Sequence, residues 1–149
     1  MADIEISQAE ADALIAIEKQ CVEERNWLFP EPGGKLAIPL VSPDKRETFT
    51  LDITRTQIKL GKATYQNRAR LAIVLMRLDL DGSPHRNPDG QDVPCPHLHI
   101  YREGYADKWA FPAPADLDGS KQDLLSTLEA FMRHCNITKP PQINKGLFS

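Results

Sequence analysis

The chain has 149 residues, of which 41% are hydrophobic and 26% charged, and its formal net charge is −3. This length is typical of one globular domain, and the composition excludes a coiled coil, a disordered tail and a disulfide-rich scaffold. No apolar run approaches the roughly 20 residues that a membrane-spanning helix needs, and the acidic N-terminus excludes a secretory signal, so we expect one domain over residues 1–149 and no membrane partner.

The first predicted element is a helix that begins at Ser7. Ser7 and Glu10 have the spacing of a capping box, and apolar residues then recur at helical intervals until about Glu24. A Pro/Gly cluster breaks the chain after this helix. The next apolar segment, Leu36–Val41, contains a proline and is predicted to be an edge strand at best.

Two stronger strand patterns follow. The segment Thr48–Thr54 alternates apolar and polar side chains, which predicts a half-buried strand. The segment Arg70–Leu80 is apolar on both faces, which predicts a central strand covered on both sides. Between them, Ile58 and Leu60 either continue the first strand or begin another.

A Gly/Pro-rich loop is predicted over residues 81–96. Sixteen residues is long for a loop in a compact domain, and long loops are usually functional or mobile. A hairpin is predicted next, with strands at 97–102 and 108–111 and a turn at Gly104. The long loop therefore leads directly into the first strand of this hairpin.

A second helix is predicted to begin with Ser120 as its N-cap and to stop near Asn136, before two prolines. The tail is expected to dock through Leu147 and Phe148. Strands grouped between two helices favour the α+β class. We therefore expect an antiparallel meander sheet of about four to six strands with an N-terminal and a C-terminal helix packed on it.

The net charge conceals a strong asymmetry along the chain. Residues 1–34 carry 2 basic and 8 acidic side chains, whereas residues 35–77 carry 9 basic and 3 acidic side chains. Such asymmetry suggests a polyanionic partner on one face and a basic partner on another. The alternative is that the acidic and basic segments pair with each other within the fold.

Three of the four histidines fall within fifteen residues, and His97 and His99 share one face of a predicted strand with Tyr101. One interpretation is a surface that handles phosphate. Cleavage of RNA without a metal needs an acid and a base, and histidine serves either role near neutral pH. His97 and His99 are then the acid–base candidates and Tyr101 assists them. Basic side chains would hold the phosphate, and the candidates are Arg68, Arg70, Arg77, Arg102 and Lys108.

A second interpretation is a metal site formed by His85, His97 and His99, because an HxH pair on a strand is a common ligand pair for a divalent metal such as zinc. Asp89, Asp92 and Cys95 are local alternatives for the third ligand. A third interpretation is that His97 and His99 are surface or hydrogen-bonded residues with no chemical role.

Several segments resemble a family of small bacterial proteins of unknown function, and the resemblance runs from about Phe29 to Phe148. The segments that carry it are Thr64–Arg70, Pro84–Gly90, Pro94–Tyr105, Asp107–Ala110 and Cys135–Thr138. Such proteins look like accessory genes of mobile elements and prophages. The resemblance implies no established activity and no catalytic residues, but it suggests a toxin, an antitoxin or an inhibitor of host defence.

The function expected first is therefore action on nucleic acid by a ribonuclease-like toxin without a cofactor. The rival is a non-enzymatic inhibitor of a host defence complex, similar to an anti-CRISPR protein, which binds its protein partner through an acidic or a basic face. A histidine-bound metal protein is the second alternative. Three dispersed cysteines without a CxxC pair suit a reducing compartment, so we expect a cytoplasmic protein.

Overall fold

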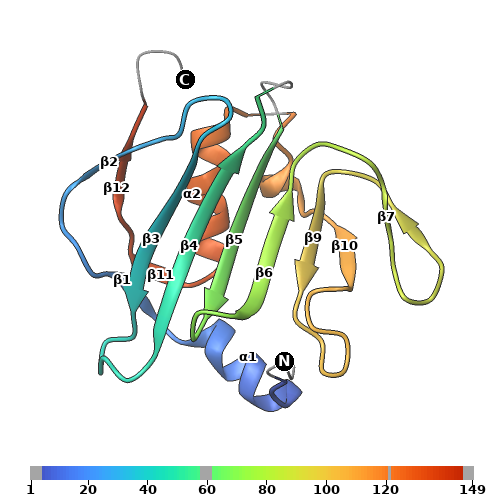
Figure 1. Cartoon of the computed structure of the whole chain (residues 1–149), viewed down its shortest axis with the longest axis horizontal. Coiled ribbons are helices and arrows are strands. Elements are labelled where there is room, and N and C mark those ends of the chain that lie inside the picture. The colour runs from blue at the N-terminus through green and yellow to red at the C-terminus, as the bar shows by residue number, and fades with distance from the viewer. Residues whose placement is uncertain (1–4, 58–61, 121, 146–149) are drawn as a thin grey trace.

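The computed structural model describes residues 5–57, 62–120 and 122–145. It confirms the α+β class, with two α-helices and one large, curled sheet (Figure 1). In chain order the elements are α1 (Gln8–Ala16), β1 (Lys19–Cys21), β2 (Asn26–Leu28), β3 (Lys35–Val41), β4 (Thr48–Arg55), β5 (Ala63–Ala69), β6 (Ile73–Asp79), β7 (His85–Arg86), β8 (Asp92–Val93), β9 (His97–Ile100), β10 (Ala110–Pro112), the 3₁₀ turn η1 (Ala115–Leu117), α2 (Leu124–His134), β11 (Ile137–Lys139) and β12 (Gln142–Asn144).

The main sheet has eight strands in the order β10-β9-β6-β5-β4-β3-β1-β11. The six strands from β3 to β10 in this order form an antiparallel meander, as predicted. The predicted sheet of four to six antiparallel strands is nevertheless wrong, because β1 adds to β3 and β11 then pairs parallel to β1. Both added strands have only three residues, which is too short for an alternating pattern to be recognised.

One face of the sheet packs against α2 and forms the hydrophobic core (Figure 1). From β4, Leu51 and Ile53 are fully buried, and Leu128 and Phe131 of α2 are fully buried as well. Tyr65 of β5 donates its hydroxyl hydrogen to the carbonyl oxygen of Leu124 at 2.8 Å, so the sheet and the helix are also joined by a hydrogen bond. We call this face of the sheet the inner face and the opposite face the outer face.

The first helix begins as predicted but is much shorter. The Ser7 hydroxyl accepts a hydrogen bond from the backbone N–H of Glu10 at 3.1 Å, which confirms the N-cap. The helix ends at Ala16, and β1 occupies part of the segment predicted to be helical. Lys19 explains the difference, because its buried ammonium and its strand pairing require extended backbone here.

The second helix begins three residues later than predicted. Asp123, not Ser120, is the N-cap, and its carboxylate accepts a hydrogen bond from the backbone N–H of Ser126 at 2.7 Å. Ser120 instead bonds to the carboxylate of Asp118. The predicted stop is confirmed, because Asn136 adopts a left-handed backbone with φ 56° directly after the helix.

Two strand predictions also need correction. The strand β3 lies inside the sheet, because its proline needs to offer only a carbonyl to the β1 side, where Pro39 accepts from the N–H of Val22. The predicted strand Arg70–Leu80 is shorter than expected and begins only at Ile73, because Arg70 and Leu71 have positive φ and form the turn between β5 and β6. The strand β5 was not predicted, because its sequence ATYQNRA has a single large apolar side chain and therefore lacks the alternating apolar pattern of a strand.

The long loop contains the short antiparallel pair β7–β8. This pair is attached to the edge strand β10 by Asn87, whose side-chain amide donates to the carbonyl of Ala110 and accepts from its N–H. The predicted roles of Ile58, Leu60, Leu147 and Phe148 lie outside the described residues. Neither helix in the described part of the chain is long and apolar enough to cross a membrane.

Candidate metal centre

The candidate site lies on the outer face of the sheet, where β6 and β9 pair. The antiparallel register places Asp79 opposite His97 and Arg77 opposite His99. Strand alternation turns these four side chains away from Leu98, which is buried in the core on the inner face. The predicted HxH pair is therefore real, and it meets an acidic and a basic side chain of the neighbouring strand.

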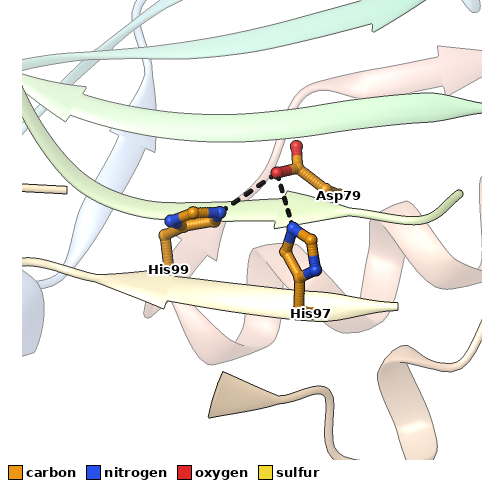
Figure 2. A group of neighbouring side chains, drawn as sticks. All are labelled: Asp79, His97 and His99. Atoms are coloured by element: carbon orange, nitrogen blue, oxygen red, sulfur yellow. Dashed lines mark hydrogen bonds and ion pairs between the residues drawn. The ribbon is translucent and has the colours of Figure 1, made fainter. Parts of the chain in front are cut away.

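One carboxylate oxygen joins the two imidazoles (Figure 2). The Oδ2 atom of Asp79 lies 3.1 Å from the Nε2 atom of His97 and 3.1 Å from the Nε2 atom of His99. One ligand atom from each residue lies within 4.8 Å of the others. His97 and His99 are 3% and 1% exposed, whereas the Asp79 side chain is 21% exposed, so the carboxylate is the side of the group that faces solvent.

The hydrogen bonds of His99 define which of its nitrogens carries a proton. Its Nδ1 atom lies 2.7 Å from the carbonyl oxygen of Asp107, which only accepts, so Nδ1 donates. Its Nε2 atom lies 3.0 Å from an Nη2 atom of Arg77, which only donates, and 3.1 Å from the Oδ2 atom of Asp79, which only accepts. Nε2 of His99 therefore lies between a donor and an acceptor.

His97 is held in a similar way. Its Nδ1 atom lies 3.1 Å from the carbonyl oxygen of Val93 and 3.5 Å from the thiol sulfur of Cys95. When Nδ1 donates to the Val93 carbonyl, the Nε2 lone pair also points at Asp79. A backbone carbonyl that fixes one ring nitrogen and leaves the other for an ion is the usual support of a metal-bound histidine.

Asp79 is ionised at neutral pH. Burial raises the pKa of its carboxyl, but the contact with His99, the positive charge of Arg77 and the hydrogen bond from Thr64 outweigh burial and hold the pKa below its usual range. The site therefore offers a negatively charged oxygen between two imidazole nitrogens.

The charged groups around the imidazoles do not balance. Arg77 donates to Asp107 at 2.6 Å, and its Nε atom lies 3.5 Å from the Oδ2 atom of Asp79. With neutral histidines, one guanidinium against two carboxylates leaves one net negative charge in this hydrogen-bonded group. A divalent cation at the three ligand atoms would offset this negative charge and leave one net positive charge.

The three ligand atoms suit a small divalent metal. Zinc binds histidine nitrogen and carboxylate oxygen at about 2.0–2.2 Å, and a tetrahedral ion then separates its ligand atoms by about 3.3 Å. The two 3.1 Å separations between Asp79 and the imidazoles are already close to that value. Only the two imidazole nitrogens have to approach each other for the ion to be held.

His85 lies beside this group but is not one of its three members. Its ring centroid is 4.6 Å from that of His99 and 5.9 Å from that of His97. Its Nε2 atom bonds to the carbonyl oxygen of Lys108 at 2.7 Å. The alternatives Asp89 and Asp92 lie elsewhere and bond to the N–H of Gln91 and to Arg86, respectively.

Tyr101 directly follows β9, but its hydroxyl bonds to the backbone before α1 and not to the histidines. It is buried, donates its hydroxyl hydrogen to the carbonyl of Ile6 at 2.9 Å and accepts from the N–H of Ile6 at 3.0 Å. Its hydroxyl thus ties the segment before α1 to the sheet.

The basic candidates are not gathered around the histidines, except for Arg77. Arg68 forms an ion pair with Asp52, and Arg70 forms ion pairs with both Glu47 and Glu10. The pair between Arg70 and Glu10 joins the basic segment of the chain to the acidic one, as the alternative view of the charge asymmetry expected.

The two remaining basic candidates lie on the loop between β9 and β10. The guanidinium of Arg102 stacks over the ring of Trp109 at 4.4 Å. Lys108 is exposed, and its backbone carbonyl rather than its ammonium contacts the histidine group.

Asp79 is the member of the candidate site that the sequence interpretation missed. It ends the apolar strand β6 eighteen residues before His97, with the long loop between them. A signal was present, because a strand that pairs in antiparallel register with the HxH strand must place one of its last outward residues beside the first histidine.

Comparison with known proteins gives a family but no activity. No curated protein and no solved structure matches the sequence. A family model described as a family of unknown function (DUF6978) matches residues 6–137, which include both helices and the whole candidate site. The chain therefore belongs to this family of unknown function.

Proposed function

We propose that this protein binds a divalent transition metal ion through Asp79, His97 and His99, and that zinc is the ion that best matches these ligands. The observation that carries the proposal is the Nε2 atom of His99. In a neutral His99 this nitrogen accepts from Arg77 and also faces the carboxylate of Asp79 at 3.1 Å. Two acceptors at this distance repel each other unless a cation lies between them.

A proton on Nε2 of His99 is the competing explanation of this contact. It would make a doubly protonated imidazolium at a side chain that is 1% exposed, and it would direct an N–H at the guanidinium of Arg77. Such an imidazolium would pair with the Asp79 carboxylate, but its positive charge would also be buried beside that of Arg77, which is costly. A metal ion avoids both penalties because it uses the lone pair that the Asp107 carbonyl has already oriented.

Three protein ligands leave a fourth position on a tetrahedral ion. Catalytic zinc sites have this arrangement, with water or substrate in the open position, whereas structural sites are closed by four protein ligands. The solvent-facing carboxylate of Asp79 marks the side on which that position would lie. The proposal thus includes a metal ion that can exchange one ligand with the surroundings.

Action on nucleic acid and inhibition of a host complex stay predictions from the sequence. The metal proposal assigns His97 and His99 a different role from that of free acid and base. Their burial favours this role, since a free acid or base has to reach the substrate's proton directly or through one water molecule.

The experiment is a calorimetric titration of zinc into protein that has been dialysed against a chelator. We expect one zinc ion per chain in the wild type and loss of binding in Asp79→Ala, His97→Ala and His99→Ala. His134→Ala is the matched control, because His134 bonds to Asp116 at the far end of α2 and is expected to leave binding unchanged.

A second readout guards against variants that fail to fold. Urea unfolding of the wild type should show about 2.7 kcal/mol of extra stability when free zinc is at 100 times its dissociation constant. Absence of zinc binding by folded wild-type protein would contradict the proposal, as would equal binding by wild type and a folded His99→Ala variant.

A further inference from the structure

Arg77 contacts two of the three proposed metal ligands. Its guanidinium makes three contacts, at 2.6 Å to Asp107, at 3.0 Å to Nε2 of His99 and at 3.5 Å to Asp79. Its side chain is 25% exposed, so the residue is partly open to solvent. Arg77 lies directly opposite His99 and two residues before Asp79 on β6.

The contact with His99 and a bound metal exclude each other. The Nε2 atom of His99 has a single lone pair, which either accepts the hydrogen bond from Arg77 or binds the ion. Metal binding therefore releases one N–H donor of Arg77 at the edge of the metal site. Arginine stays protonated, so this donor still needs an acceptor.

The charge of the site changes sign at the same time. Arg77, Asp79 and Asp107 together carry one net negative charge with neutral histidines. A divalent ion converts this to one net positive charge. The metal-free site thus attracts a cation, and the metal-loaded site attracts an anion.

We propose, on the basis of the metal site above, that the loaded centre binds an oxyanion, a phosphoryl or carboxylate group, with one oxygen on the open metal position and another on the guanidinium of Arg77. The planar fork of arginine matches both groups in two-point contacts, and such charge-assisted bonds are the strong ones. The oxyanion replaces His99 as the acceptor for Arg77. The ligand class of this protein is therefore an anionic molecule that the metal-free protein rejects.

The experiment measures anion binding to zinc-loaded and to metal-free protein by calorimetry, with methylphosphonate and acetate as separate probes. We expect at least one probe to bind about tenfold or more tightly to the zinc-loaded form. The preferred probe identifies the source of the oxyanion, as a phosphoryl group or a carboxylate. By linkage, the same probe should tighten zinc binding by the same factor.

Arg77→Met is the informative variant, and Arg68→Met is its matched control on the neighbouring strand β5. Zinc-loaded Arg77→Met should bind the anion probe about tenfold or more weakly than the wild type, since it lacks a charged donor. Arg68→Met should bind the probe like the wild type. Without any anion, Arg77→Met should bind zinc at least as tightly as the wild type, because nothing competes for Nε2 of His99.

The outcomes separate the two proposals. If folded wild type binds no zinc, the metal site itself is wrong. If zinc binds but neither probe does, or if Arg77→Met and wild type bind the probe equally, the metal site stands and the oxyanion proposal is overturned.

Discussion

Two buried polar clusters in this molecule differ in how completely they are satisfied. Lys19, at the junction of α1, β1 and α2, is fully buried and donates to the carbonyls of Ile15, Ile17 and Cys135 at 2.9, 2.9 and 2.7 Å. All three of its N–H donors have an acceptor. His99 is equally buried, but its Nε2 atom lies between the guanidinium of Arg77 and the carboxylate of Asp79 rather than against a single partner.

The difference distinguishes a cluster that folding alone explains from the candidate metal site. Burial lowers the pKa of Lys19 to about 8, so the ammonium is still mostly charged at pH 7. It donates to backbone carbonyl oxygens at the C-terminal ends of both helices, where a positive charge is favourable. Folding alone explains such a cluster. In the metal proposal, the buried nitrogen that folding places against a carboxylate obtains a cation from outside the chain.

The largest effect is expected at the satisfied cluster. Lys19→Met leaves three carbonyl groups without their donor, and we expect it to lower the free energy of unfolding by about 3 kcal/mol or more. Urea unfolding measures this. Lys35→Met, on the exposed side of β3, is the control and should change stability by less than about 0.5 kcal/mol. An effect below about 1 kcal/mol for Lys19→Met would show that the cluster is not structural.

The next effect concerns which residue completes the metal site. His99→Ala should weaken zinc binding by at least about 100-fold, while His85→Ala should weaken it by less than about tenfold, the lower limit for residues that support a metal ligand. Calorimetric titration of zinc compares the two variants. If His85→Ala loses zinc as completely as His99→Ala, the three-histidine site predicted from the sequence is right and the assignment of Asp79 has to be revised.

A smaller effect is expected at Asp79. Asp79→Asn removes the negative charge that Arg77 and Thr64 hold in place, so the metal-free protein should lose about 1 kcal/mol of stability, and zinc binding should be lost as well. Chemical unfolding with a chelator and with zinc measures both. Unchanged stability together with retained zinc binding would contradict the role given to Asp79.

The smallest effect is expected at Asp123, an exposed carboxylate that caps α2, and concerns how stability depends on pH. The backbone N–H of Ser126 lowers the pKa of Asp123 from 3.8 to about 2. The folded state therefore holds the ionised form more strongly than the unfolded state does. This stabilisation is fully present above the unfolded pKa of 3.8 and is lost as the pH falls through about 2.

Asp123→Asn keeps a side chain that caps helices well but cannot titrate. The wild type should exceed this variant in stability by about 0.5 kcal/mol at pH 7, and the difference should disappear near pH 2. Unfolding curves at several pH values measure it. A difference that is constant over this range would show that the charge of Asp123 adds nothing to its capping role.

The sequence predicted those parts of the fold whose patterns are local. The N-cap at Ser7, the alternating strand around Leu51 and the helix stop at Asn136 depend on neighbouring residues and are confirmed. The end of α1 was missed because the partners of Lys19 include Cys135, which is 116 residues away. The short strands β1 and β11 likewise form only through each other and β3.

The candidate site was predicted in the same uneven way. His97 and His99 were recognised because strand alternation is a local property. Asp79 was not, because its place beside them depends on the pairing register across a long loop. The charge asymmetry left open that basic and acidic segments pair with each other, but it did not indicate that Arg68 and Arg70 would be paired with carboxylates while Arg77 would join the histidines.

The most direct test of the metal site is nitrogen NMR of the His99 imidazole, with and without zinc, using His99→Ala to assign the signals. The account predicts a protonated Nδ1 and an unprotonated Nε2 in the metal-free protein at neutral pH, and a large shift of the Nε2 signal when one equivalent of zinc is added. Two protonated nitrogens, or an Nε2 signal that zinc leaves unchanged, would contradict it.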